Sequence, residues 1–172
     1  MIEYVIFGTS HVIQESLQFA NQVEKCIREC EITLVAEEFP FEIVSKVHAV
    51  ATSLNIPYLQ IDLFPYDWRT YHIDYEMAMR LDAGCLAGLD VRLSHADEVR
   101  EELWLQKIEK NIERRRVLIV CGYLHLHYLA IKINNRGDKI LDQKTYPSDL
   151  LNRTPDKIFT LMELREYLEN NL

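Results

Sequence analysis

Short apolar runs alternate with longer amphipathic segments along this chain. Apolar and β-branched residues fill Tyr4–Phe7 and Ile32–Ala36, and runs of this length are typical of buried strands. Between these two runs, apolar residues recur every three or four positions over Val12–Cys30, which predicts a helix of about five turns. The same reasoning predicts a helix over Pro40–Leu54, because proline is well tolerated in the first turn.

The second half of the chain continues this alternation. Further strands are predicted at Tyr58–Leu63, Val117–Cys121 and Lys139–Thr145, a loop at 65–70, and helices at 74–81, 94–116 and 158–167. Residues 123–133 fit either a strand or a helix, and Gly137 is a suitable residue to end a helix there. Strands that alternate with helices indicate a single α/β domain over residues 1–172, with a largely parallel central sheet sandwiched by helices.

Composition narrows the class of protein. The chain has 172 residues, of which 48% are hydrophobic and 27% are charged, as expected for one globular domain. Its net charge of −8 argues against binding to nucleic acid or to an anionic membrane, because polyanions repel such a surface. The apolar runs are far shorter than the roughly 20 residues of a membrane helix, and Met1–Tyr4 does not resemble a signal peptide. We therefore expect a cytoplasmic protein with reduced cysteines.

Two of the predicted strands are followed by the same short pattern. Gly8-Thr9-Ser10-His11 follows the first strand, and Gly122-Tyr123-Leu124-His125 follows the fourth. Random placement of five glycines and six histidines would produce about 0.2 such spacings. Glycine permits a sharp turn from strand to helix, and the dipole of that helix favours a neutral imidazole in its first turn. Such a ring can act as a base or bind a metal, although it can also simply bond to backbone.

Carboxylate and guanidinium side chains also lie where they could reach the ends of the predicted strands. Glu37 and Glu38 follow the second strand, so one of them can face the crevice where ligands of α/β sheets bind. A carboxylate there could orient a histidine, bind a metal or act as a base, whereas a surface pair is the plainer interpretation. Arg100, on a predicted helix, suits a carboxylate, a phosphate or a developing oxyanion. Candidates for binding substrate at the same rim are Glu38, Trp68, Arg69, Tyr123 and His127.

Together these elements resemble a superfamily that groups TraB-type and Tiki-type proteins, erythromycin-esterase-like hydrolases and haem-binding ChaN-like proteins. Its members share a strand with Gly-x-x-His, a second strand that ends in glutamate, an arginine on a later helix and a second Gly-x-x-His. The similar segments here are Val5–Val12, Leu34–Glu38, Val99–Trp104 and Val117–Leu126, in the same order. For the family's glutamate we favour Glu37, because it directly follows the apolar run.

The resemblance implies a hydrolase that acts on an ester, amide or peptide bond of a small molecule or peptide. His11 would be the general base, Glu37 would orient it, and Arg100 would stabilise the oxyanion. His125 would be a second base or acid. His127 could replace His125 if the ambiguous segment is a strand, because both would then face one side.

Relatives differ in their chemistry, so two alternatives stay open. Some are regarded as metal-dependent, in which case His11, Glu37 and His125 would hold a divalent metal such as Mn, Co or Zn, with water in the open position. Others bind haem, so the alternative function is a non-catalytic module for a small ligand. We also expect His11, Arg100 and His125 to form a neutral-to-positive rim that suits a small or locally anionic ligand.

Overall fold

A parallel sheet of five strands forms the centre of the protein, in the order β3-β2-β4-β1-β5. The computed structural model describes residues 1–9, 11–39, 44–63, 94–111 and 116–146. The strands are β1 (Glu3–Thr9), β2 (Leu34–Glu37), β3 (Tyr58–Gln60), β4 (Arg116–Gly122) and β5 (Lys139–Thr145). Neighbouring strands are parallel throughout, so the predicted α/β class with a parallel sheet is confirmed.

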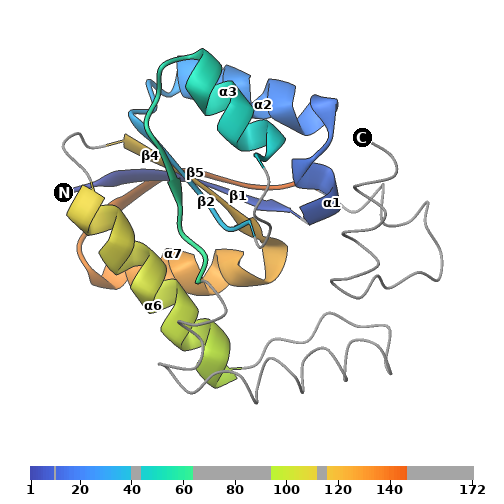
Figure 1. The fold of residues 1–172 in the computed structure, drawn as a ribbon. Helices are drawn as coiled ribbons and strands as arrows, with labels where there is room; N and C mark the ends of the chain where they lie inside the picture. The colour runs from blue at the N-terminus through green and yellow to red at the C-terminus, as the bar shows by residue number, and fades with distance from the viewer. Residues whose placement is uncertain (10, 40–43, 64–93, 112–115, 147–172) are drawn as a thin grey trace, which may run out of the picture.

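Helices cover both faces of this sheet (Figure 1). One face is covered by α1 (His11–Gln14), α2 (Leu17–Glu29) and α3 (Lys46–Ser53). The other face is covered by α6 (Ser94–Asn111) and α7 (Leu126–Asn135), and the short 3-10 helix η1 (Tyr123–His125) precedes α7. Among the described residues, no helix is both long enough and apolar enough to span a membrane.

The path of the chain creates a switch point beside β4. From β1 the chain moves to β2 and then to β3, with α2 and α3 on one face. It returns to β4 by way of α6 and passes to β5 by way of α7, both on the other face. Because β1 and β2 flank β4, the connections leave neighbouring strands in opposite directions. Ligands of open parallel sheets bind in the crevice that opens at such a point, beyond the carboxyl ends of the strands.

The alternation of side chains along each strand divides the core into two layers. In β2, Leu34 and Ala36 pack on the side of α6 and α7, whereas Val35 packs on the side of α2 and α3. Trp104 and Ile108 of α6 fill the first layer. Since successive residues of a strand face opposite ways, this alternation also decides where the polar residues after β2 point.

Two predicted helices have different boundaries because serine side chains cap the backbone. The single helix predicted over Val12–Cys30 is wrong: it is divided into α1 and α2 at Ser16, whose Oγ accepts a hydrogen bond from the Phe19 N–H at 3.1 Å. Helix α3 begins after Ser45 rather than at Pro40, and the Ser45 side chain caps it in the same way. Pro40 itself lies outside the described residues.

The ambiguous segment after β4 is helical. It forms η1 and α7, and the chain leaves α7 through Gly137, whose φ of +76° is easily reached by glycine. The Gly137 N–H bonds to Asn134 O and the Asp138 N–H bonds to Ile133 O, the pattern of a Schellman motif. The prediction that Gly137 would end a helix is therefore confirmed.

Helix α6 is described over Ser94–Asn111, and Arg116, predicted to be the last residue of that helix, belongs to β4 instead. Strand β5 spans Lys139–Thr145, as predicted. The predicted loop at 65–70 and the predicted helices at 74–81 and 158–167 lie outside the described residues.

Gly8 lies within β1 and lets the start of α7 pack onto that strand. A Cβ on Gly8 would stand 1.9 Å from Leu126 Cδ1 and 3.1 Å from Tyr123 Cα. The sequence placed this glycine at a turn, but β1 continues to Thr9. The missing side chain therefore serves close packing between β1 and the η1–α7 segment.

Candidate functional site

The two glutamates after β2 point to opposite faces of the sheet. Glu37 follows the direction of Val35, and its carboxylate bonds to Ser45 on the α3 side. Glu38 follows the direction of Ala36, and its carboxylate bonds to Arg100 of α6. The structure thus brings Glu38, and not the favoured Glu37, to the α6 side. The physical reason is the two-residue repeat of an extended chain.

The guanidinium of Arg100 is the centre of a buried ion cluster at the switch point. Its Nη2 donates to Glu38 Oε1 at 2.6 Å and to Asp62 Oδ1 at 2.9 Å, and its Nη1 donates to Asp97 Oδ1 at 3.1 Å. Arg100 is 3% exposed, and the three carboxylate residues are buried with it. Burial by itself lowers the pKa of Arg100, but Asp62 and Glu38 more than offset this and raise that pKa above its ordinary value. The guanidinium therefore stays charged.

His125 joins this cluster from η1. Its Nδ1 lies 2.9 Å from Glu101 Oε1, while its Nε2 lies 3.7 Å from Glu38 Oε1 and 4.0 Å from Asp97 Oδ1. The residue is 1% exposed. The Trp104 ring lies across the imidazole in an edge-to-face arrangement, with the ring centroids 4.8 Å apart. The imidazole is thus held on one nitrogen and on one face.

Gly122 ends β4 within contact of both groups. Its N–H donates to Glu38 Oε2 at 2.7 Å. A Cβ on Gly122 would stand 3.3 Å from that oxygen, closer than ordinary van der Waals contact, and 3.4 Å from His125 Cδ2. The second Gly-x-x-His pattern therefore works as a unit, because its glycine binds the carboxylate that its histidine approaches.

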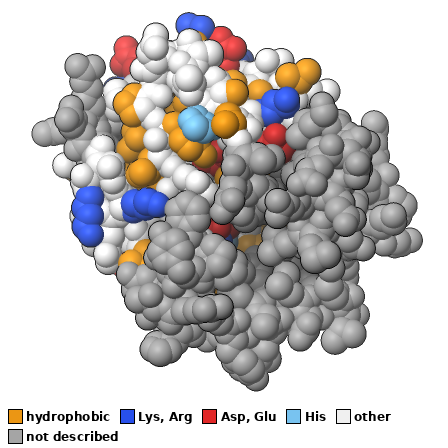
Figure 2. Space-filling model, in the orientation of Figure 1, with side chains coloured by type: hydrophobic (Ala, Val, Ile, Leu, Met, Phe, Trp, Pro, Cys, Tyr) orange, Lys and Arg blue, Asp and Glu red, His pale blue; other side chains and the backbone are white. Residues whose placement is uncertain are grey.

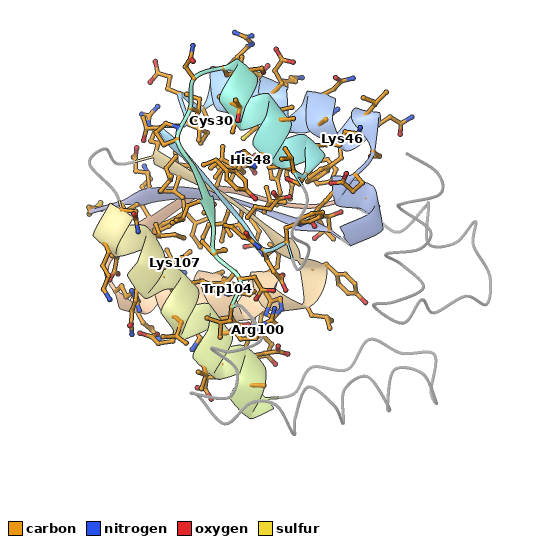
Figure 3. All side chains as sticks on the ribbon, viewed as in Figure 1. Cys30, Lys46, His48, Arg100, Trp104 and Lys107 are labelled. Carbon is orange, nitrogen blue, oxygen red and sulfur yellow. The ribbon has the colours of Figure 1, made fainter. Side chains whose placement is uncertain are left out.

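Helix α6 supplies most of the cluster from one buried stripe. The buried positions recur at helical spacing and are Ala96, Asp97, Arg100, Glu101, Trp104, Leu105 and Ile108. The stripe is apolar from Trp104 onward, and its residues before Trp104, other than Ala96, are charged; there the helix lies at the carboxyl ends of the strands. Arg100 and Trp104 both extend from α6 toward the sheet (Figure 3). The guanidinium carbon of Arg100 stands 5.0 Å from the centre of the Trp104 ring.

Sequence reasoning missed three acidic residues of this site. Asp97 and Glu101 share the buried stripe of α6 with Arg100, and charged residues on a helical stripe that turns apolar were the available signal. Asp62 lies two residues beyond the end of β3 at Gln60, but the strand predicted over Tyr58–Leu63 included it, so the rule that strand ends carry function did not single it out.

The described part of the site is acidic. Four carboxylates surround one guanidinium and one imidazole: Glu38, Asp62, Asp97 and Glu101. The expectation of a neutral-to-positive rim is therefore wrong for the residues that the structure describes. An uncharged or cationic group fits these surroundings better than an anion.

The first Gly-x-x-His pattern reaches the same end of the sheet. His11 begins α1, and Thr9 in β1 pairs with Gly122 in β4, so the two patterns follow neighbouring strands. The His11 side chain lies outside what the structure describes, and its role stays a prediction.

Of the predicted substrate-binding residues, Glu38 lies in the ion cluster, whereas the side chains of Tyr123 and His127 are exposed. Tyr123 is 38% exposed, and His127 is exposed on α7. Because the segment is helical rather than extended, His127 does not share the direction of His125, and it cannot replace His125 in the cluster. Trp68 and Arg69 lie outside the described residues.

Glu37 forms a separate buried site on the opposite side of the sheet. Ser45 Oγ and Tyr58 OH donate to its Oε2 at 2.5 and 2.8 Å, whereas its Oε1 has no hydrogen-bond partner among the described residues. The His48 ring stacks on the Tyr58 ring with centroids 3.9 Å apart. Over α3, hydrophobic side chains lie around a histidine on the surface (Figure 2). Burial raises the pKa of Glu37 to about 8, so this carboxyl holds a proton at neutral pH.

Two of the residues predicted to hold a divalent metal, Glu37 and His125, do not meet in the described part of the structure. Glu37 and His125 lie on opposite sides of the sheet. Glu38, which does lie beside His125, is bound by Arg100 and Gly122. Within the described ranges, no group of three His, Cys, Asp or Glu side chains could hold a metal ion.

Comparisons of the chain with family models, with curated proteins and with solved structures find no match. The resemblance to the superfamily of TraB-type proteins and erythromycin-esterase-like hydrolases therefore stays a prediction from four sequence segments. The site itself is the basis for a functional proposal.

Proposed function

We propose that this protein is a cytoplasmic hydrolase that cleaves an ester, amide or peptide bond of a small molecule or peptide. One observation carries the proposal: Glu38, Arg100 and His125 come from distant parts of the chain and meet at the switch point of the sheet. Glu38 Oε1 lies 2.6 Å from Arg100 Nη2 and 3.7 Å from His125 Nε2. These are the residue types that the sequence pattern anticipated, with Glu38 in the place expected for Glu37.

His125 carries the proton in the proposed reaction. A water molecule attacks the carbonyl carbon and transfers a proton to the imidazole. The imidazolium then gives this proton to the leaving oxygen or nitrogen as its bond to the carbonyl carbon breaks. The products are a carboxylic acid and an alcohol or amine. Glu38 supports this cycle, because a carboxylate close to the ring stabilises the positive charge that forms on it.

Arg100 acts as a positioning residue in this scheme. The hydrogen bonds of its Nε, Nη1 and Nη2 go to the carboxylates of Asp62, Asp97 and Glu38. This arrangement supports a role in holding Glu38 against His125 more than a role at the oxyanion. His11, which follows the neighbouring strand, remains our candidate for a second acid–base group.

Turnover of model substrates in chelated buffer tests this function. The panel contains p-nitrophenyl esters, anilides and fluorogenic peptides, including substrates with cationic groups because the site is acidic. We expect His125→Asn and Glu38→Gln each to lower kcat/KM by about 10²- to 10⁴-fold. Glu98→Gln changes an exposed residue of α6 and is the matched control, with unchanged activity. Circular dichroism verifies that each variant is folded.

The other outcomes separate the competing interpretations. If neither the wild type nor any variant turns over a substrate and the variants only lose stability, the cluster is a structural ion network. Activity that disappears on chelation and returns with Mn, Co or Zn would require a metal. A Soret band after haem addition, without turnover, would indicate a binding module.

A further inference from the structure

Glu101 contacts one of the two ring nitrogens of His125. Its Oε1 stands 2.9 Å from Nδ1, and the residue is 0% exposed. We propose that Glu101 is a positioning residue, which keeps the proton of the neutral His125 ring on Nδ1 and leaves Nε2 as the base. The kinetic part of this inference rests on the proposed function, whereas the position of the proton does not.

The chemistry of the pair decides which nitrogen carries the proton. A carboxylate can only accept hydrogen bonds. A short contact between a carboxylate oxygen and Nδ1 therefore requires a hydrogen on Nδ1, and in a neutral imidazole the other nitrogen is then unprotonated. Glu101 thus selects one of the two tautomers of His125.

The second nitrogen faces the ion cluster. Nε2 of His125 lies 3.7 Å from Glu38 Oε1 and 4.0 Å from Asp97 Oδ1, distances that are longer than a direct hydrogen bond. The ring therefore presents Nε2 to the carboxylate that Arg100 holds, while Nδ1 is committed to Glu101. This is the direction that a general base at the switch point requires.

Packing prevents the His125 ring from flipping by a half-turn about its Cβ–Cγ bond. Trp104 crosses the imidazole at an interplanar angle of 65° and is itself fully buried in the core between α6 and the sheet. In such a close-packed environment, turning the ring over would displace neighbouring side chains. The hydrogen bond from Glu101 and the contact with Trp104 therefore set the tautomer and the orientation together.

Nitrogen NMR tests the inference without a substrate. Long-range ¹H–¹⁵N spectra of protein labelled with ¹⁵N-histidine report the protonation of each ring nitrogen, and His125→Asn identifies the signals by their loss. We expect a protonated Nδ1 and an unprotonated Nε2 in the neutral wild-type ring. Glu101→Gln introduces an amide N–H that can donate to Nδ1, so the proton should move to Nε2. Glu98→Gln should leave both signals unchanged.

Kinetics on the best substrate from the panel provides the second measurement. Glu101→Gln should lower kcat by about 10²- to 10⁴-fold with little change in KM, because the base would carry a proton on the wrong nitrogen. Glu101→Asp keeps a carboxylate and should recover part of this loss. A purely structural residue would not show this dependence on the carboxylate.

Each outcome decides between the two proposals. A wild-type ring with its proton on Nε2 would overturn the role of Glu101. If Glu101→Gln does not fold, the spectra of the wild type and of Glu101→Asp still decide the question. The expected tautomers without any turnover would refute the hydrolase and leave the assignment of the proton intact.

Discussion

Replacing Glu37 with glutamine should stabilise the protein, and the gain should grow as the pH rises. Burial raises the pKa of Glu37 from an ordinary value of 4.5 to about 8. Between these two pH values the unfolded chain releases the proton that the folded protein keeps, so stability falls as pH rises through this window. Glutamine has a similar shape and an oxygen that can accept the bonds from Ser45 and Tyr58, but it has no proton to lose.

Linkage gives the size of this effect. Within the window, each pH unit lowers the free energy of unfolding of the wild type by about 1.4 kcal/mol. Relative to a pH at which both the folded and the unfolded chain hold this proton, the wild type then loses about 1 kcal/mol of its free energy of unfolding at pH 5 and about 3 kcal/mol at pH 7. The advantage of Glu37→Gln should therefore increase by about 2 to 3 kcal/mol between these conditions.

Urea unfolding at pH 5, 6 and 7, followed by tryptophan fluorescence, measures this difference. Glu24→Gln removes an exposed carboxylate paired with Arg28 and should change stability by less than about 0.5 kcal/mol at every pH. Glu38→Gln should instead lower the free energy of unfolding, because Glu38 accepts bonds from Arg100 and Gly122 as a buried anion. A Glu37→Gln advantage that does not change with pH would refute the conclusion that this buried carboxyl is protonated.

Three further changes probe other parts of the structure. Arg100→Met leaves buried carboxylates without their cation and should lower the free energy of unfolding by about 3–5 kcal/mol in urea titrations; a loss below about 1 kcal/mol would contradict the ion cluster. Gly8→Ala places a Cβ against Leu126 and should cost about 1–3 kcal/mol in thermal denaturation, and Leu126→Ala should relieve part of that cost rather than add to it. Burial raises the pKa of the Cys26 thiol to about 12, so mass spectrometry should find it unmodified by iodoacetamide at pH 8 until urea is added.

The fold was accessible from local patterns because each element depends mainly on its own apolar spacing. The run at Val117–Cys121 and the segment Lys139–Thr145 match β4 and β5 closely. The errors came from hydrogen bonds that spacing does not reveal. The cap at Ser16 interrupts an otherwise regular helical stripe, and the cap at Ser45 delays the start of α3.

The site was only partly accessible from the sequence. Strand ends and helical placement identified Arg100 and His125, and the structure places both in the ion cluster. The preference for Glu37 over Glu38 was wrong. It rested on the position of Glu37 directly after an apolar run, and that position does not say to which face of the sheet a side chain points. The position of Glu101 on the buried stripe of α6 was a signal that it is buried, but not that it contacts His125, which stands 24 positions further along the chain.

The sequence by itself determined the alternation of strands and helices, the parallel α/β architecture and the segments that meet at one end of the sheet. Those properties depend on the spacing of apolar residues and on the order of the elements along the chain, and both can be read from residues that are close in the sequence. Only the tertiary structure decided that Glu38 faces Arg100 while Glu37 is buried with Ser45 on the other side. It also decided that carboxylates surround the guanidinium. Those outcomes depend on how the faces of β2, β4 and α6 pack together, because a charge can be buried only where other elements supply its partners.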